Sequence, residues 1–131
     1  MTLIATEAKR LSNVVKQELF PEAGYCRLAV TYDGTAADLV PGTVLGKVTA
    51  DGTYKIAIQT AIDGSEVADA IVMVEQTVIA DTATKVLCLV KGPAIVSKDG
   101  LILDASYNLD AEKAAVFAAL EAKGINCNDA V

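Results

Sequence analysis

The sequence contains no histidine, and this limits the reactions that its side chains could catalyse. Histidine is the commonest general base and metal ligand in proteins, so its absence excludes Ser-His and Cys-His nucleophile pairs. The three cysteines, Cys26, Cys88 and Cys127, lie far apart and form no Cys-x-x-Cys pair. This spacing favours neither a disulfide framework nor a zinc site and predicts three inert thiols.

Two short motifs resemble reactive sites, and neither is complete. The Gly-x-x-x-Gly-Lys motif at residues 42–47 has three residues between its glycines, whereas a phosphate-binding loop has four. Val48 also stands where that loop needs Ser or Thr. The pair Ser97-Lys98 could suggest a hydrolytic dyad, but adjacent residues of an extended segment point to opposite faces.

Four Asp-Gly pairs begin at Asp33, Asp51, Asp63 and Asp99. None of them is followed by the alternating oxygen ligands and the late Glu of a calcium-binding loop, so they predict turns. The sequence therefore indicates no catalytic residue, no metal site and no cofactor site.

The composition describes one acidic domain. The 131 residues have a net charge of −6, which disfavours binding to nucleic acid or to an anionic membrane. No apolar run is long enough to span a bilayer, and the first residues lack a basic leader, so we expect synthesis in the cytoplasm. Because 22 residues are Ala and only six are aromatic, each buried position contributes little area. We therefore expect a partner subunit to cover part of the surface.

Most of the chain after residue 24 shows strand patterns. Residues 25–32 alternate between apolar and polar positions, and Pro41-Gly42 is typical of a type II turn. Asp51-Gly52 predicts a two-residue type I′ hairpin between strands at 43–50 and 53–60.

That turn sets the register of the predicted hairpin. It places Leu45 opposite Ile58 and Gly46 opposite Ala57. Gly46 carries no side chain inside a strand, so we expect another part of the chain to press against it.

Further strands are expected at residues 70–76, 85–91, 94–97 and 101–104, with a bend at Gly92-Pro93. The apolar period then changes and predicts a helix at about 109–123, with Asn108 as N-cap and Gly124 at the C′ position. The expected fold is α+β and mostly β: a small barrel-like or sandwich-like domain of six or seven short strands with one C-terminal helix.

The first 24 residues leave two alternatives. Leu11, Val14, Val15 and Leu19 recur at helical spacing before Pro21, which favours a short amphipathic helix on the domain core. The same segment could instead be an N-terminal arm that orders on a partner.

Three stretches in order, residues 41–55, 86–96 and 119–125, resemble the head decoration proteins of tailed bacteriophages of the lambda protein D type. The similar region runs from about residue 40 to residue 125. This resemblance implies a homotrimer that binds the major capsid protein on the outside of the expanded head, at three-fold and quasi-three-fold positions, and cements the shell. It implies no catalytic residue.

Members of that family use an N-terminal segment that orders on the capsid, and residues 1–24 occupy that place. The resemblance thus makes their apolar side chains the candidate capsid contacts: Leu3, Ile4, Leu11, Val14, Val15, Leu19 and Phe20. The candidate structural positions are Pro41, Gly42, Gly46, Asp51, Gly52, Gly92, Pro93 and Gly124. The alternative function is a different virion or host β-rich binding module, tail-associated or adhesin-like.

Overall fold

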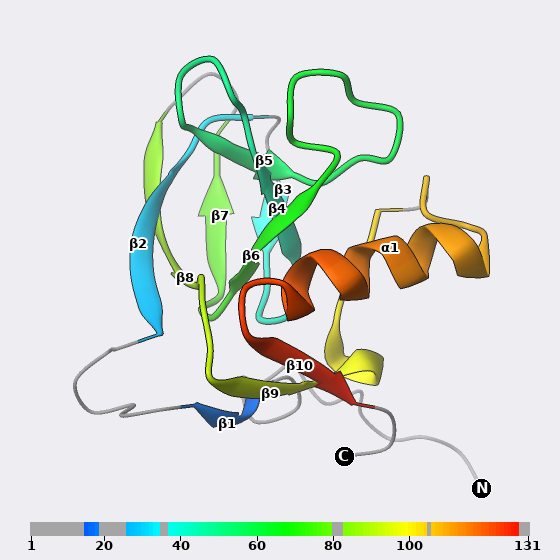
Figure 1. Ribbon diagram of the computed structural model, residues 1–131. Helices are drawn as coiled ribbons and strands as arrows, with labels where there is room; N and C mark the ends of the chain where they lie inside the picture. Colours follow the sequence, from blue (N-terminus) through cyan, green and yellow to red (C-terminus); the bar gives the residue numbers. More distant parts are fainter. Residues whose placement is uncertain (1–14, 19–25, 35–36, 80–82, 105, 129–131) are drawn as a thin grey trace, which may run out of the picture.

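The computed structural model describes residues 15–18, 26–34, 37–79, 83–104 and 106–128, which form a mostly β domain with one α-helix (Figure 1). This confirms the expected fold class. In chain order the elements are β1 Val15–Glu18, β2 Arg27–Tyr32, β3 Ala37–Leu39, β4 Val44–Lys47, β5 Tyr54–Ile56, β6 Ala68–Val72, β7 Gln76–Val78, β8 Thr84–Leu89, β9 Ala94–Ser97, the 3₁₀ helix η3 Lys98–Gly100, α1 Asp110–Glu121 and β10 Ile125–Asn128.

Five strands close into a barrel in the order β2-β5-β4-β6-β8. Neighbouring strands of the barrel run antiparallel, except that β2 and β5 run parallel and pair through Tyr32 and Tyr54. Closure leaves these strands without the free edges of an open sheet. One apolar cluster takes side chains from all five barrel strands and from β3 and β7: Val30, Tyr32, Leu39, Leu45, Tyr54, Ala70, Val72, Val78, Val86 and Cys88.

A second apolar cluster joins the barrel to α1 and to the sheet β1-β9-β10. Strand β6 contributes to both clusters because successive side chains of a strand point to opposite faces. Ala70 and Val72 belong to the barrel cluster, whereas Ile71 and the following Met73 belong to the second cluster. The predicted burial of this strand on both faces is therefore confirmed, although it spans Ala68–Val72 rather than 70–76.

The three-stranded sheet lies at the end of the domain away from the β4–β5 turn (Figure 1). Strand β9 is its centre, with β1 antiparallel on one side and β10 parallel on the other. Strands β3 and β7 form a separate antiparallel pair.

The β4–β5 hairpin exists, but the predicted register is wrong by two residues. Leu45 pairs with Ile56 instead of Ile58, and Gly46 pairs with Lys55 instead of Ala57. A shift of two residues leaves each side chain on its predicted face, because the side-chain period of a strand is two.

A longer turn explains the shift. The Val48 N–H donates to the Thr53 carbonyl at 2.7 Å, and the Gly52 N–H donates to the Val48 carbonyl at 2.9 Å. Residues 49–52 thus form a four-residue loop with Gly52 at φ +75°, and the predicted two-residue type I′ turn is wrong.

The helix starts one residue later than predicted, and its N-cap is Leu109 rather than Asn108. The Glu112 carboxylate accepts a hydrogen bond from the Leu109 N–H at 3.3 Å, which is one half of a capping box. Gly124 has the expected left-handed φ of +85°, but it lies two residues after the C-cap Ala122 rather than directly after it.

Three other expectations need correction. The described residues contain ten strands rather than six or seven, because several are only three or four residues long. Residues 101–104 form no strand, and only Ile102 makes an isolated bridge, to Thr43. Residues 15–18 lie in the segment where a helix was one alternative, and they are a strand because β9 supplies a pairing edge.

Candidate functional site

Strand β1 is the described part of the N-terminal segment. Val15, a candidate capsid contact, pairs with Val96 and packs half-buried against the second apolar cluster. The other candidate contacts lie outside the described residues: Leu3, Ile4, Leu11, Val14, Leu19 and Phe20. Of the seven candidate capsid contacts, the structure therefore describes only Val15, which lies on the domain core.

An ion pair joins β1 to the barrel. The Arg27 Nε of β2 donates to both carboxylate oxygens of Glu18, at 3.1 and 3.0 Å. The Glu18 side chain is only 5 % exposed, whereas that of Arg27 is 27 % exposed. The hydrogen bonds that Arg27 donates to Glu18 raise the pKa of Arg27. This pair holds the end of β1 against the barrel wall.

The candidate structural residues Gly92, Pro93 and Gly124 meet where two turns cross. The Gly92 N–H donates to the Lys123 carbonyl at 2.8 Å, and the Gly92-Pro93 peptide bond is cis. A Cβ added to Gly92 would overlap the Gly124 carbonyl group, so this backbone contact requires glycine. This contact positions the start of β10, which follows Gly124, beside the start of β9.

The other structural candidates surround β4. Gly42 has φ +104°, and the Thr43 N–H donates to the Val40 carbonyl at 3.1 Å, so Pro41-Gly42 occupies the centre of a β-turn. A Cβ added to Gly46 would overlap the Ser65 backbone carbonyl. The chain element that presses on Gly46 is thus the segment before β6.

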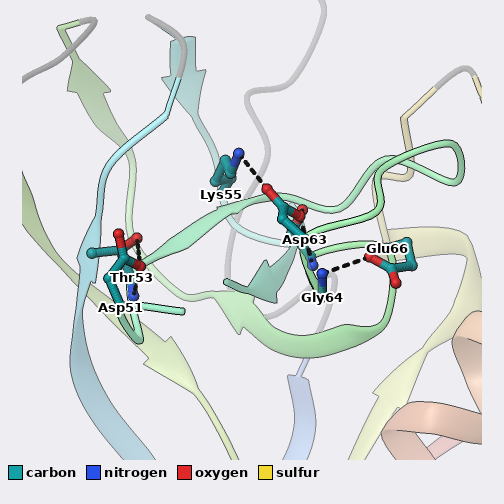
Figure 2. Close-up of polar contacts among 7 residues, drawn as sticks. Asp51, Thr53, Lys55, Asp63, Gly64 and Glu66 are labelled. Atoms are coloured by element: carbon teal, nitrogen blue, oxygen red, sulfur yellow. Dashed lines mark hydrogen bonds and ion pairs between the residues drawn. The ribbon is translucent and has the colours of Figure 1, made fainter. Parts of the chain in front are cut away.

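That segment belongs to a long connection between β5 and β6, residues 57–67, which we call the β5–β6 loop. Figure 2 shows the polar contacts that fix its shape. Asp63 accepts hydrogen bonds from the Ser65 N–H at 3.1 Å and the Ser65 hydroxyl at 2.6 Å, and it forms an ion pair of 2.6 Å with Lys55. The Gly64 N–H donates to the Glu66 carboxylate at 2.9 Å.

These contacts also set the charge of two carboxylates. The hydrogen bond from Lys55, followed by those from Ser65, lowers the pKa of Asp63 well below its usual value. In the neighbouring hairpin turn, hydrogen bonds from the Thr53 backbone N–H and hydroxyl lower the pKa of Asp51. Both groups are therefore ionised at neutral pH.

Hydrogen bonds attach the β5–β6 loop to its surroundings, beginning with the Ala57 N–H, which donates to the Val44 carbonyl at 3.1 Å. The Asp63 carbonyl accepts from the Thr49 N–H at 2.9 Å, the Glu66 carbonyl accepts from the Tyr107 hydroxyl at 2.7 Å, and the Gln59 N–H donates to the Ser106 hydroxyl at 2.9 Å. The loop nevertheless exposes several apolar side chains. Ile62 is 97 % exposed, Val67 is 55 % exposed and Ile58 is 39 % exposed.

Beside this loop, η3 and the following segment form a cleft of about 450 Å³ against α1. Its lining combines apolar side chains with two lysines and one acid: Lys98, Leu101, Leu103, Asp104, Tyr107, Asn108, Lys113 and Phe117. The Lys98 ammonium lies 5.0 Å from the centre of the Phe117 ring, within cation–π range. Sequence reasoning missed both the loop and the cleft. Three exposed β-branched residues at 58, 62 and 67 were the available signal for the loop.

The described domain includes all three cysteines of the chain. All three cysteines are free and buried, as predicted. Burial raises the pKa of Cys88 to about 12 and that of Cys127 to about 11, so both thiols are protonated at neutral pH. Across residues 15–18, 26–34, 37–79, 83–104 and 106–128, no three Asp, Glu, Cys or His side chains gather as metal ligands.

Among the described residues, no helix is both long and apolar enough to cross a membrane. The described surface carries a loop with exposed apolar side chains, a cleft of mixed lining and a strand anchored by an ion pair. The fold defines a small, mostly β domain built on a closed five-stranded barrel.

A family model of the bacteriophage lambda head decoration protein D matches residues 4–125. The chain therefore belongs to this family, whose members are structural components of the phage head, and the resemblance noted in the sequence is confirmed. A search of curated proteins found no match.

Proposed function

We propose that this chain is a cement protein that binds the outside of the expanded phage head as a homotrimer and stabilises the shell against the pressure of packed DNA. The observation that carries the proposal is the family match over residues 4–125. The surface features of the described domain support it, because they suit contact with other proteins.

Stabilisation of this kind requires no chemistry. A ligand that binds only the assembled, expanded lattice shifts the equilibrium towards that state by mass action. Three copies joined as a trimer bind more strongly than one, since the second and third contacts form at high effective concentration. Each individual contact can then be shallow.

Within this proposal, the segment before β1 makes the contact with the capsid. The Arg27–Glu18 ion pair and the pairing of β1 with β9 fix where that segment leaves the domain. A truncation must therefore stop before Val15, because removal of β1 would also take away Glu18 and leave the Arg27 charge without this partner.

The test is co-sedimentation with expanded heads that lack decoration protein. The full chain should bind, and a variant without residues 1–14 should keep its oligomeric mass and its circular dichroism spectrum but lose most of the binding. Purified phage tails serve as the matched control surface. Binding to tails but not to heads would replace the proposal by the tail-associated alternative, and equal binding of the truncated variant would refute the role of the N-terminal segment.

A further inference from the structure

We propose that Asp33-Gly34 is a site of spontaneous isoaspartate formation, and that this modification loosens the barrel where β2 meets β5. Four Asp-Gly pairs occur in the chain. This sequence favours the reaction because glycine places no side chain in the path of the attacking nitrogen. The contacts around the four pairs set Asp33-Gly34 apart from the other three. The inference concerns backbone chemistry and does not depend on the proposed function.

The reaction needs no reactant other than water. The Gly34 backbone nitrogen attacks Cγ of Asp33, a nitrogen–carbon bond forms, and the hydroxyl of the carboxylic acid leaves as water with the amide hydrogen. Water then opens the succinimide ring. When it breaks the bond between the Gly34 nitrogen and the former backbone carbonyl, the main chain runs through Cγ of Asp33. The chain then contains the same atoms as before, but its backbone is longer by one methylene group.

Both reacting groups are accessible at Asp33-Gly34. Asp33 is exposed, and among the contacts of the described residues none is made by its carboxylate or by the Gly34 N–H. The Asp33 N–H does donate to the Tyr54 carbonyl, at 2.9 Å. That bond lies on the other side of the Asp33 Cα from the reacting nitrogen. The Gly34 nitrogen can therefore approach Cγ without breaking any hydrogen bond of the described residues.

At Asp51-Gly52 both reacting groups are held. The Asp51 carboxylate accepts hydrogen bonds from the Thr53 N–H at 3.0 Å and from the Thr53 hydroxyl at 2.7 Å. The Gly52 N–H donates to the Val48 carbonyl at 2.9 Å. Attack would have to break these bonds, and each broken bond adds to the barrier.

Asp63-Gly64 is held in the same way. Lys55 and Ser65 bind the Asp63 carboxylate, and the Gly64 N–H donates to the Glu66 carboxylate at 2.9 Å. The hydrogen bond from Lys55, followed by those from Ser65, also lowers the pKa of Asp63. A carboxylate that stays ionised has no hydroxyl to lose, so it resists attack by the amide nitrogen.

The fourth pair, Asp99-Gly100, belongs to η3. Gly100 is buried there, and the Leu101 N–H donates to the Lys98 carbonyl at 3.2 Å. The backbone around this pair is therefore fixed by the 3₁₀ turn. Of the four pairs, Asp33-Gly34 is the one that the described contacts leave open to the reaction.

The modification falls where the barrel is joined least extensively. One residue pair, Tyr32 with Tyr54, joins β2 to β5, whereas six residue pairs join β2 to β8. Gly34 also lies close to this junction, since an added Cβ would be 3.2 Å from the Tyr32 hydroxyl and 3.3 Å from the Lys55 Cβ. A backbone lengthened between Asp33 and Gly34 displaces one of them. We therefore expect isoaspartate to weaken the Asp33–Tyr54 hydrogen bond.

The first experiment ages the unchanged full chain at mildly acidic pH. Peptides from a digest are treated with protein isoaspartyl methyltransferase, which labels isoaspartate, and the labelled sites are located by mass spectrometry. We expect at least about tenfold more isoaspartate at Asp33 than at Asp51 or Asp63, because hydrogen bonds must break at the latter two. No isoaspartate at Asp33, or an amount at Asp51 or Asp63 that equals or exceeds it, overturns the proposal.

The second experiment uses Asp33→Asn and Asp51→Asn as a matched pair. Asparagine forms the same succinimide with loss of ammonia, and the later hydrolysis gives a mass change that spectrometry follows. An amide oxygen at position 51 can still accept the hydrogen bonds from Thr53. In the folded protein we expect Asp33→Asn to deamidate at least about tenfold faster than Asp51→Asn. In urea the two rates should be similar, and a difference that persists there would assign the rate to the local sequence and refute the structural argument.

The third experiment tests the effect on the barrel. The isoaspartate form is separated from the unchanged chain by chromatography, and amide hydrogen exchange is measured on both. We expect faster exchange of the Asp33 N–H in the isoaspartate form. The Val90 N–H, which donates to the Cys26 carbonyl before the start of β2 at 2.9 Å, is the control and should exchange as in the unchanged chain. Equal exchange of the Asp33 N–H in both forms would refute the loosened junction.

Discussion

Replacement of Gly46 tests the packing between β4 and the β5–β6 loop most sharply. An added Cβ would overlap the Ser65 carbonyl and lie 2.6 Å from the Ser65 Cα. Backbone atoms cannot rotate away as a side chain can, so either β4 or the loop must move. Gly46 does not have a positive φ, so the strain in Gly46→Ala would come from the close contact and not from the backbone conformation.

The loop cannot move at low cost. The Thr49–Asp63 and Tyr107–Glu66 hydrogen bonds hold the chain on both sides of Ser65. Overpacking of a well-packed site costs about 1–3 kcal/mol, and a backbone that resists displacement places this variant at the upper end. We expect Gly46→Ala to lose about 3 kcal/mol in the free energy of unfolding, or roughly 10 °C in Tm for a domain of this size. Gly46→Val should lose more.

Urea unfolding followed by circular dichroism at one fixed protomer concentration measures this loss, because assembly makes stability depend on concentration. Lys47→Ala is the matched control, since Lys47 is the exposed neighbour of Gly46 in β4 and its truncation should change stability by less than about 0.5 kcal/mol. At a position with space, Gly→Ala stabilises by about 0.4–1 kcal/mol through the unfolded chain. A Gly46→Ala variant as stable as the unchanged protein would therefore refute the close approach of Ser65.

Three further predictions follow from the ion pairs and the thiols. Arg27→Leu leaves the Glu18 carboxylate, which is only 5 % exposed, without its partner. We therefore expect a loss of about 1–3 kcal/mol in the free energy of unfolding and faster hydrogen exchange in β1. Unchanged exchange in β1 would contradict the role of the pair. The pKa of Asp63 is lower in the folded protein than its unfolded value of 3.8, so this carboxylate contributes stability that is fully present above pH 3.8 and is lost as the pH falls through the folded pKa. We therefore expect Asp63→Asn to flatten the fall in Tm below about pH 4. An unchanged profile would assign the acid sensitivity to other groups. The raised pKa values of Cys88 and Cys127, about 12 and 11, keep both thiols protonated at pH 8. An alkylating reagent should therefore modify them only after denaturation, as detected by mass spectrometry. Rapid labelling of the native protein would show that burial does not protect them.

Sequence patterns predicted the features that depend on neighbouring residues. The strand at 94–97 has its predicted bounds, because Gly92-Pro93 before it and the turn at Lys98 after it are both local signals. Burial of β6 on both faces followed from an uninterrupted apolar run.

Features that the local pattern leaves open could not be predicted in this way. Asp51-Gly52 fits a four-residue loop as well as a two-residue turn, and the two differ in which residues pair, here Val48 with Thr53. Asn108 resembles an N-cap in the sequence, but the Glu112 side chain caps the residue after it. The cleft and its proximity to the β5–β6 loop arise only when residues far apart in the chain are folded together.

The position of β9 between strands from opposite ends of the chain has a consequence for biosynthesis. Val15 must wait for Val96 to emerge from the ribosome before β1 can pair, and β10 can join β9 only after α1 has been made. Such non-local pairing delays folding until almost the whole polypeptide exists. Strand β1, whose Glu18 pairs with Arg27 of the barrel, is consequently fixed to the domain only when nearly the whole chain has been made.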